Sequence, residues 1–249
     1  VAAAVWGFGV APLPDYPSLA DSPDPSIPGR VAFVRWAERA CVYVVPASGG
    51  DLRRLPCADE GREGIVDWIG GPVGWTRDGR IVVQAFSPSG NRVIVLDPDS
   101  GRVLERIDVE EPLGERPPPK RGNARGDGAR LLVNRAGRAA TLGIAPVDAS
   151  PREIARVSGP PSYTFWEARW SPDGEWILVR DSNQNLLVVR AREGAPLRLL
   201  AELVSGPVAW HVPGHSEDAI DLDSLRAAAE GRGRVPRSDA RLLPPPADR

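Results

Sequence analysis

The sequence predicts an all-β protein built from repeated units of several strands each. One short pattern occurs three times, namely an apolar strand, an Asp-Gly turn and a second apolar strand. The aspartates of these turns, Asp78, Asp127 and Asp173, are separated by 49 and 46 positions. An Asp-Gly pair supplies the positive-φ positions that a two-residue hairpin turn needs. Recurrence at this spacing predicts repeated supersecondary units.

Composition supports this prediction and excludes some classes of protein. The chain has 249 residues, of which 42% are hydrophobic, which is enough for a substantial core. Its 26 glycines and 27 prolines are typical of many short strands joined by turns. The formal net charge of −2 provides no basic surface, so no nucleic-acid partner is expected.

The first thirty residues differ from the rest of the chain. Residues 1–10 are apolar and uncharged, but a bilayer needs about twenty such residues. We expect them to be the end of a transmembrane or signal segment that begins upstream of Val1, which would provide a membrane tether. The alternative is a segment that packs on the domain. Residues 11–30 are rich in Pro, Asp and Ser, which predicts an extended linker.

Four groups of short apolar runs follow between residues 31 and 212. The predicted strands are 31–36, 41–46 and 52–57; then 72–75, 80–86, 92–97 and 102–109; then 122–125, 129–134, 140–146 and 152–157; then 166–170, 175–181, 185–191 and 196–203. Four antiparallel strands per repeat make the blade of a β-propeller. The predicted fold is therefore an all-β propeller of about four four-stranded blades.

The two ends of the array suggest how it is completed. The first group lacks a first strand, whereas residues 206–212 repeat the start of the second group without a blade of their own. We expect 206–212 to pair with 31–36 and close a four-bladed ring, because closure removes exposed strand edges. The alternative is a fragment of a larger propeller. Residues 213–249 are predicted to be a C-terminal tail with a short helix over 221–230 and little order from 232 onward.

The chain has two cysteines, Cys41 and Cys57, on consecutive predicted strands. They mirror each other about Gly49 in the connecting turn, so an antiparallel hairpin places them opposite each other. The sequence therefore predicts a disulfide between them, which favours an oxidising compartment. Two free buried thiols are the alternative.

Few residues suggest catalysis or metal binding. His211 and His215 are the only histidines, and Pro and Gly between them interrupt the helix that His-x3-His would need for a metal. The sequence has no G-x-S-x-G nucleophile motif, no dinucleotide-binding glycine motif and no P-loop. We therefore expect no catalytic residues, no metal and no cofactor.

The aromatic residues divide into core and surface candidates. Trp75, Trp170 and Trp210 share one position of the repeat, which predicts packing in the core or between blades. Trp166 and Trp176 flank that position and are candidates for a surface, although core packing is expected for most of the tryptophans. The third group is the least regular and has the longest connecting loop, 110–120. This loop, with Tyr163 and Trp166 as aromatic contacts, is the predicted binding face.

The repeated turn Trp170-Ser-Pro-Asp-Gly174, with its variant Trp75-Thr-Arg-Asp-Gly79, resembles that of TolB-like and WD-repeat-like β-propellers of bacteria. The resemblance covers residues 31–212. It implies a non-catalytic binding or sensing module with a protein or peptide partner. Similar propellers lie behind a single transmembrane helix in anti-sigma-type envelope proteins, which implies an extracytoplasmic, membrane-associated location. The alternatives are an accessory propeller of a hydrolase or peptidase, and a ring that is itself an enzyme.

Overall fold

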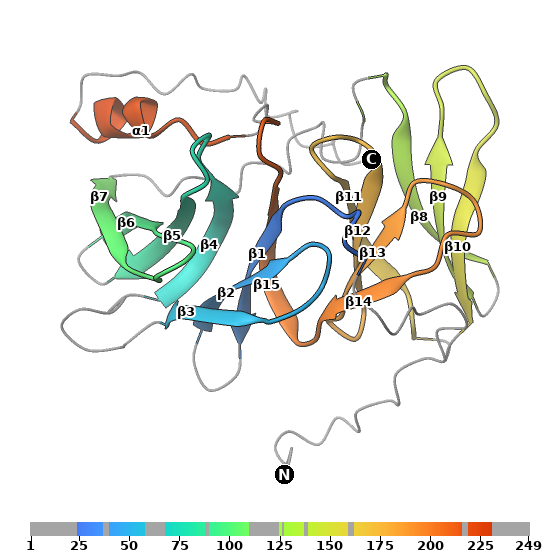
Figure 1. Cartoon of the computed structure of the whole chain (residues 1–249), viewed down its shortest axis with the longest axis horizontal. Coiled ribbons are helices and arrows are strands. Elements are labelled where there is room, and N and C mark those ends of the chain that lie inside the picture. Colours follow the sequence, from blue (N-terminus) through green and yellow to red (C-terminus); the bar gives the residue numbers. More distant parts are fainter. Residues whose placement is uncertain are drawn as a thin grey trace, which may run out of the picture.

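The computed structural model describes most of the repeat region and the helix that follows it (Figure 1). The described residues are 24–36, 40–57, 68–87, 90–109, 125, 127–136, 139–158, 162–215 and 219–230. They form fifteen β-strands and one α-helix, and the strands make four antiparallel sheets. Each sheet is called a blade here and is numbered by its order in the chain.

Three blades have four strands, and blade 3 has three among the described residues. Blade 1 contains β15 (Val204–His211), β1 (Arg30–Trp36), β2 (Ala40–Pro46) and β3 (Arg53–Cys57). Blade 2 contains β4 (Trp68–Trp75), β5 (Ile81–Ser87), β6 (Gly90–Leu96) and β7 (Val103–Val109). Blade 3 contains β8 (Arg130–Ala136), β9 (Ala139–Ala145) and β10 (Arg152–Ser158). Blade 4 contains β11 (Phe165–Trp170), β12 (Trp176–Asp181), β13 (Leu186–Arg190) and β14 (Arg198–Ala201). The predicted all-β propeller of four blades is confirmed.

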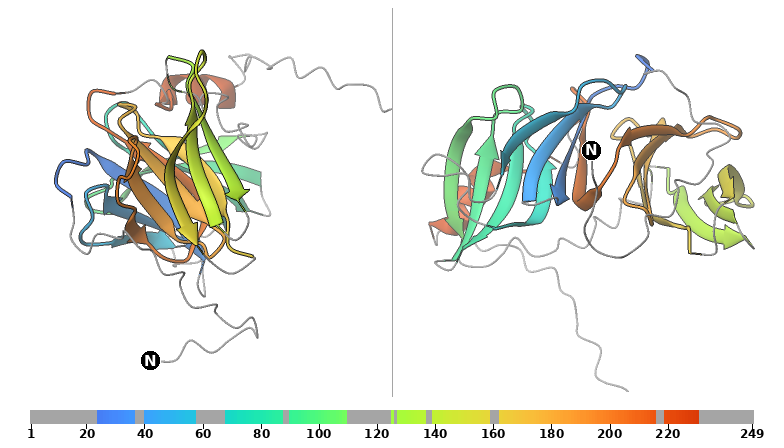
Figure 2. Two further views of the ribbon diagram at one scale, coloured as in Figure 1. Left: turned by 90° about the vertical axis from the view of Figure 1, so that its right-hand side faces the viewer. Right: turned by 90° about the horizontal axis from the view of Figure 1, so that it is seen from below.

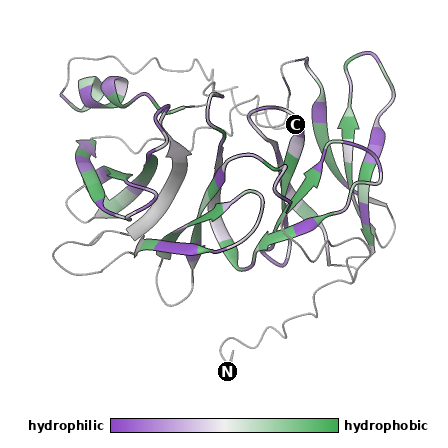
Figure 3. Ribbon diagram, viewed as in Figure 1, coloured by the Kyte–Doolittle hydropathy of each residue, from purple (hydrophilic) through white to green (hydrophobic). Residues whose placement is uncertain are grey.

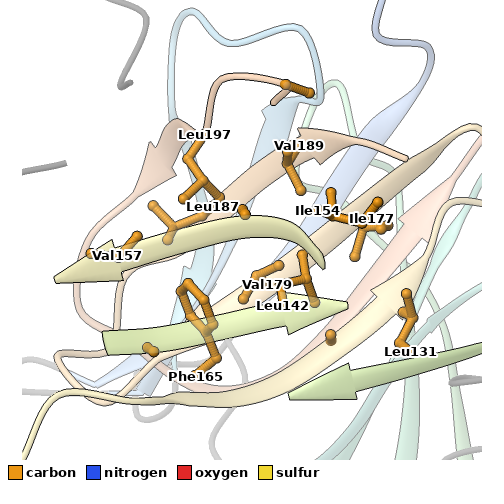
Figure 4. Packing of buried hydrophobic residues seen from close by; sticks show 14 of the residues in the cluster. Leu131, Leu142, Ile154, Val157, Phe165, Ile177, Val179, Leu187, Val189 and Leu197 are labelled. Atoms are coloured by element: carbon orange, nitrogen blue, oxygen red, sulfur yellow. The ribbon is translucent and has the colours of Figure 1, made fainter. Parts of the chain in front are cut away.

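Hydrophobic residues run along the strands, and three buried clusters join neighbouring blades (Figure 3). One cluster lies between blades 1 and 2 and includes Trp75 and Ile81. A second lies between blades 1 and 4 and includes Phe33 and Trp176. The third joins blades 3 and 4 (Figure 4). The blades therefore lie in the spatial order 2, 1, 4, 3, with blades 2 and 3 at the two ends of an arc (Figures 1 and 2).

The last strand completes the first blade. β15 pairs antiparallel with β1, with Val31 opposite Trp210 and Ala32 opposite Ala209. The predicted pairing of 206–212 with 31–36 is thus confirmed, although the expected closed ring is wrong for the part of the chain described. No hydrophobic cluster of described residues joins blade 2 to blade 3, so the arc is open between them.

The helix α1 (Leu222–Ala229) gives a physical reason for this opening. Asp221 caps its N-terminus, and Leu222 packs on Val82, Val93 and Val95 of blade 2. This is the face of blade 2 that points away from blade 1, and in a closed ring blade 3 would cover it. The predicted short helix over 221–230 is confirmed, and it occupies the place of a neighbouring blade.

The Asp-Gly turns differ in one respect from the prediction. β4 ends at Trp75 and β5 begins at Ile81, so the connection is longer than two residues. Of the Asp-Gly pair only Gly79 has a positive φ, of 79°. The Thr76 hydroxyl accepts a hydrogen bond from the Arg80 amide at 2.9 Å and donates to Asp78 at 2.5 Å. The backbone amide of Thr76 also donates to the Arg80 carbonyl at 2.9 Å, so the turn spans residues 76–80 and the hydroxyl adds to a backbone-closed turn.

Several predictions fall on residues outside the described ranges. They include residues 1–10, most of the linker 11–30, the loop 110–120 and the tail from 232 onward. Of the predicted strand 122–125 only Arg125 is described. The described part of the chain contains no helix that is both long enough and apolar enough to cross a membrane.

Candidate functional site

Because neighbouring strands run antiparallel, the blades have two rims. β11 begins and β12 ends at one of them, which we call the Trp166 rim. The turn of residues 182–185 and the connection 202–203 also lie there, because they join strands that end at this side. The Asp-Gly turns lie at the opposite end of the strands, which we call the turn rim.

Trp166 has an unusual position in blade 4. The pairing of Phe165 with Asp181 and of Glu167 with Arg180 leaves Trp166 as an extra residue in a β-bulge. Its side chain is 54% exposed, whereas Phe165 is 3% exposed. The guanidinium of Arg180 lies over the indole ring, 5.9 Å from its centroid. The bulge and this stacking together hold a large aromatic side chain on the surface.

A charged network fixes the surroundings of Trp166. Glu167 forms ion pairs with Arg169 and Arg180. Arg169 donates to the carbonyl oxygen of Val208 at 3.3 Å, and Arg180 donates to that of Gly206 at 3.2 Å. Both carbonyls belong to β15, so these contacts also join blade 4 to blade 1. Two guanidinium groups share one carboxylate, which leaves this part of the rim positively charged.

Tyr163 does not belong to this surface. It is only 1% exposed, and its hydroxyl donates to the Asp181 carboxylate at 3.1 Å. Asp181 is fully buried and also accepts from the backbone amides of Asn183 and Asn185. The prediction that Tyr163 contacts a partner is therefore wrong, because its ring is buried and its hydroxyl belongs to a buried hydrogen-bond network under the β12–β13 turn. Trp166 remains a candidate.

The other tryptophans mostly follow the prediction. Trp75 is buried between blades 1 and 2, and its indole nitrogen donates to the Ala209 carbonyl at 3.1 Å. Trp210 donates to the Pro28 carbonyl at 2.9 Å. Trp170 packs partly on the cluster between blades 3 and 4. Trp176, for which both a surface and a core position were open, is 5% exposed and packs between blades 1 and 4.

The histidines have structural surroundings. The imidazole of His211 stacks on Trp75 with ring centroids 5.1 Å apart, and His215 is exposed. Partial burial, together with the nearby Arg30 guanidinium, lowers the pKa of His211, and Asp78 opposes this shift only in part. Among the described residues no group of three or more His, Cys, Asp or Glu side chains gathers as a metal site would require.

Cys41 and Cys57 form a disulfide between β2 and β3. They are direct partners in the strand register, although Tyr43 pairs with Arg54 and an extra residue on β3 lies between the two pairs. Pro56 lies in this interval and has no amide hydrogen for the ladder. The mirror relation about Gly49 therefore identified the pair, whereas the bulge beside it was not predicted.

Comparisons with known proteins give only distant structural matches. No family model and no curated protein matches the chain. The β-propeller domain of Cps50 (Swd1) from Myceliophteria thermophila is 14% identical, with a TM-score of 0.27 over 71% of this chain and 61% of that chain. The β-propeller domain of the trilobed protease from Pyrococcus furiosus is also 14% identical, with a TM-score of 0.26 over 68% of this chain and 52% of that chain.

A structure from a study of two prolyl endopeptidases is 16% identical, with a TM-score of 0.26 over 74% of this chain and 29% of that chain. The chain spans less than two thirds of the length of each of these three structures. At such identities and TM-scores the similarity adds nothing to the assignment of function.

Proposed function

We propose that this chain is a non-catalytic β-propeller module that binds a protein or peptide partner at its Trp166 rim. The observation that carries the proposal is the exposed indole of Trp166 on a strand that is otherwise packed into the blade. Tryptophan and arginine are the side chains most enriched at the energetic centres of protein interfaces. The bulge and the stacked Arg180 already restrict the indole, so binding costs little side-chain entropy.

Two further features of the rim agree with this role. Leu203 lies in the connection to β15, is 49% exposed and has a positive φ of 59°. A leucine held in this conformation and left in water is unusual, because a non-glycine residue there is strained. The excess of arginine over glutamate around Trp166 favours a neutral or acidic segment of the partner over a basic one.

A photo-crosslinking amino acid at position 166 tests this function. The variant is expressed in the cells that produce the protein, and adducts are identified by mass spectrometry. We expect a protein adduct that is absent when the crosslinker replaces Leu104, an exposed residue of β7 in blade 2. Absence of an adduct at position 166, or the same adduct at both positions, would contradict the proposal.

An extracytoplasmic, membrane-tethered location is part of the proposal. The Cys41–Cys57 disulfide supports it, because such bonds persist in oxidising compartments. Acid quenching of cells followed by thiol alkylation measures the state of these cysteines in vivo, and we expect them to be oxidised. Reduced thiols in the quenched cells would contradict this location.

The reading frame upstream of Val1 tests the tether and the signalling role. A transmembrane helix preceded by a small cytoplasmic domain is the result expected for an anti-sigma-like sensor. A hydrolase catalytic domain in the same frame would instead make the propeller an accessory module of that enzyme.

A further inference from the structure

A small hollow on the turn rim combines three arginines that no function above uses. It lies where blade 4 meets the segment before β1 and has a volume of about 80 Å³. Its walls are formed by Asp24, Trp176, Arg190, Arg192, Pro196 and Arg198. These residues carry three positive charges and one negative charge. From their geometry we propose that this hollow binds a phosphate group, either as free phosphate or as a small phosphomonoester.

The strand register places the key side chains on one face of blade 4. Trp176 is the direct partner of Arg190 across β12 and β13. Arg198 is the partner of Val188, which shares its face of β13 with Arg190. Three neighbouring strands thus direct Trp176, Arg190 and Arg198 toward blade 1. These three of the lining residues are held by strand ends, which are more rigid than loops.

The Arg190 guanidinium is held in place by contacts that leave donors available. Arg190 stacks on the Trp176 ring at 5.7 Å, and its ion pair with Glu175 is long, at 3.5 Å. A guanidinium has five N–H donors in a planar fork that fits the oxygens of phosphate. Stacking uses the face of that fork and leaves its edge free for an anion. Trp176 itself is 5% exposed and forms a fixed wall.

The one carboxylate of the hollow is already engaged. One oxygen of Asp24 accepts from the amide and hydroxyl of Ser26, at 3.0 and 2.6 Å. Its other oxygen lies 3.2 Å from an Nη atom of Arg198. The Ser26 hydrogen bonds and the Arg198 and Arg190 charges hold the pKa of Asp24 below its usual value. The carboxylate therefore stays charged near neutral pH and orients Arg198, but it neutralises only one of the three arginines.

Of the three arginines that line the hollow, Arg192 is the one without an ion pair among the described residues. It is exposed, and no carboxylate of the described residues lies within ion-pair distance of its guanidinium. Its backbone amide donates to the Arg190 carbonyl at 2.7 Å, which fixes the turn that carries it. A hollow of about 80 Å³ has room for one small tetrahedral oxyanion.

Calorimetric titration of the disulfide-intact protein with inorganic phosphate and with phosphoserine, in a phosphate-free buffer of fixed ionic strength, tests the proposal. We expect saturable binding of both, about tenfold weaker in the Arg192→Gln variant. Arg192 lies on the surface, so this substitution leaves the fold intact. Arg152→Gln is the matched control, because Arg152 is an exposed arginine of blade 3 at the same rim. It should bind phosphate as the unmodified protein does.

Two results would overturn the proposal. The first is absence of saturable phosphate binding, or equal weakening by Arg152→Gln, since either would mean only diffuse attraction to surface charge. The second is binding to phosphatidylcholine vesicles that contain phosphatidic acid without binding to inorganic phosphate. That result would identify a lipid headgroup, held by the membrane surface, as the ligand.

Discussion

The two ends of the blade arc are protected in different ways. At the blade 2 end the outward face carries aliphatic side chains from β5, β6 and β7, and α1 covers them. At the blade 3 end the outward positions of β9 are Thr141, Gly143 and Ala145, and no helix of the described residues packs there. Stacked repeats need polar or covered outer faces, because an uncovered apolar face promotes association. One end of this array is therefore covered by a helix, whereas the described part of the other end carries mostly small and polar side chains, with Leu132 among them.

This difference explains why pairing of the last strand does not close a ring. The β15–β1 ladder joins the chain's end to blade 1, which lies in the interior of the arc. Closure would need blade 3 to pack on the face of blade 2 that α1 occupies. The helix and blade 3 compete for the same apolar surface, and in this structure the helix covers it.

The largest effect is expected when the cap is disrupted. Leu222→Asp places a charge among Val82, Val93 and Ile107 and should reduce the free energy of unfolding by about 3 kcal/mol or more. Leu132→Asp, at a half-buried position on the outward face of blade 3, should reduce the free energy of unfolding by less than Leu222→Asp does. Urea denaturation of both variants measures the difference. If Leu222→Asp only detaches α1 and leaves the domain folded, hydrogen exchange will show loss of protection confined to blade 2. Equal effects of the two substitutions would contradict the asymmetry.

A buried amide offers a gain of stability at the blade 2 end. Gln84 is fully buried on β5, and neither its amide oxygen nor its nitrogen has a hydrogen-bond partner among the described residues. Gln84→Leu removes this uncompensated polar group and should stabilise the protein by about 1 kcal/mol. Asn134→Leu, at an exposed position of blade 3, should have little effect. A lower urea midpoint for Gln84→Leu would show that the amide has a partner in solution.

A smaller effect is expected for the ion pair between the cap and β7. Arg226 donates to both carboxylate oxygens of Glu105, at 2.8 and 2.6 Å. This contact lowers the pKa of Glu105, so its stabilisation is present at neutral pH and is lost as the pH falls below the ordinary glutamate range. Arg226→Gln should lower the urea midpoint at pH 7 and much less at pH 3.

The matched control at the other end is Arg156→Gln. It removes the exposed pair with Glu153, which lies within β10 and holds no cap in place. At pH 7, Arg156→Gln should lower the urea midpoint less than Arg226→Gln does. A loss at pH 3 as large as that at pH 7 for Arg226→Gln would mean that the arginine acts through packing alone.

A pH-dependent effect is expected between blades 1 and 2, away from the outer faces. Burial lowers the pKa of His211 in the folded protein, so protonation favours the unfolded chain. Stability should therefore be retained above the ordinary histidine pKa and fall as the pH is lowered through it and then through the folded value. Thermal melts between about pH 7.5 and 5 should show this decrease. His211→Gln should remove the part of this decrease that comes from histidine protonation. His215→Gln, at an exposed site, should leave the decrease unchanged.

The sequence predicted the strands because their signals are local. Apolar runs define the strands of blades 1, 2 and 4, and Asp-Gly turns recur in blades 2, 3 and 4. The repeat of Gly71-Pro-Val-Gly-Trp75 at Gly206 identified the strand that completes blade 1. The position of α1 could not be predicted, because its contact with Val82 and Glu105 joins segments more than a hundred residues apart.

The same limit explains the outcome for the candidate sites. Tyr163 and Trp166 are three residues apart and equally aromatic, yet a buried carboxylate at Asp181 holds one inside and a bulge directs the other outward. Arg190, Arg192 and Arg198 were overlooked because only the strand register shows that Trp176 and Asp24 lie beside them. Local patterns thus predict elements, whereas sites depend on long-range pairing.

The position of blade 1 in the arc depends on the pairing of β15 with β1. Ala32 and Ala209 are direct partners in this ladder, and partners across an antiparallel pair lie within reach of a disulfide. Ala32→Cys combined with Ala209→Cys should therefore oxidise to a crosslink between the two tryptic peptides, detected by mass spectrometry. Ala32→Cys with Ser205→Cys, four positions out of register, should not. Absence of the first crosslink, or equal yields from both pairs, would contradict the pairing of β15 with β1.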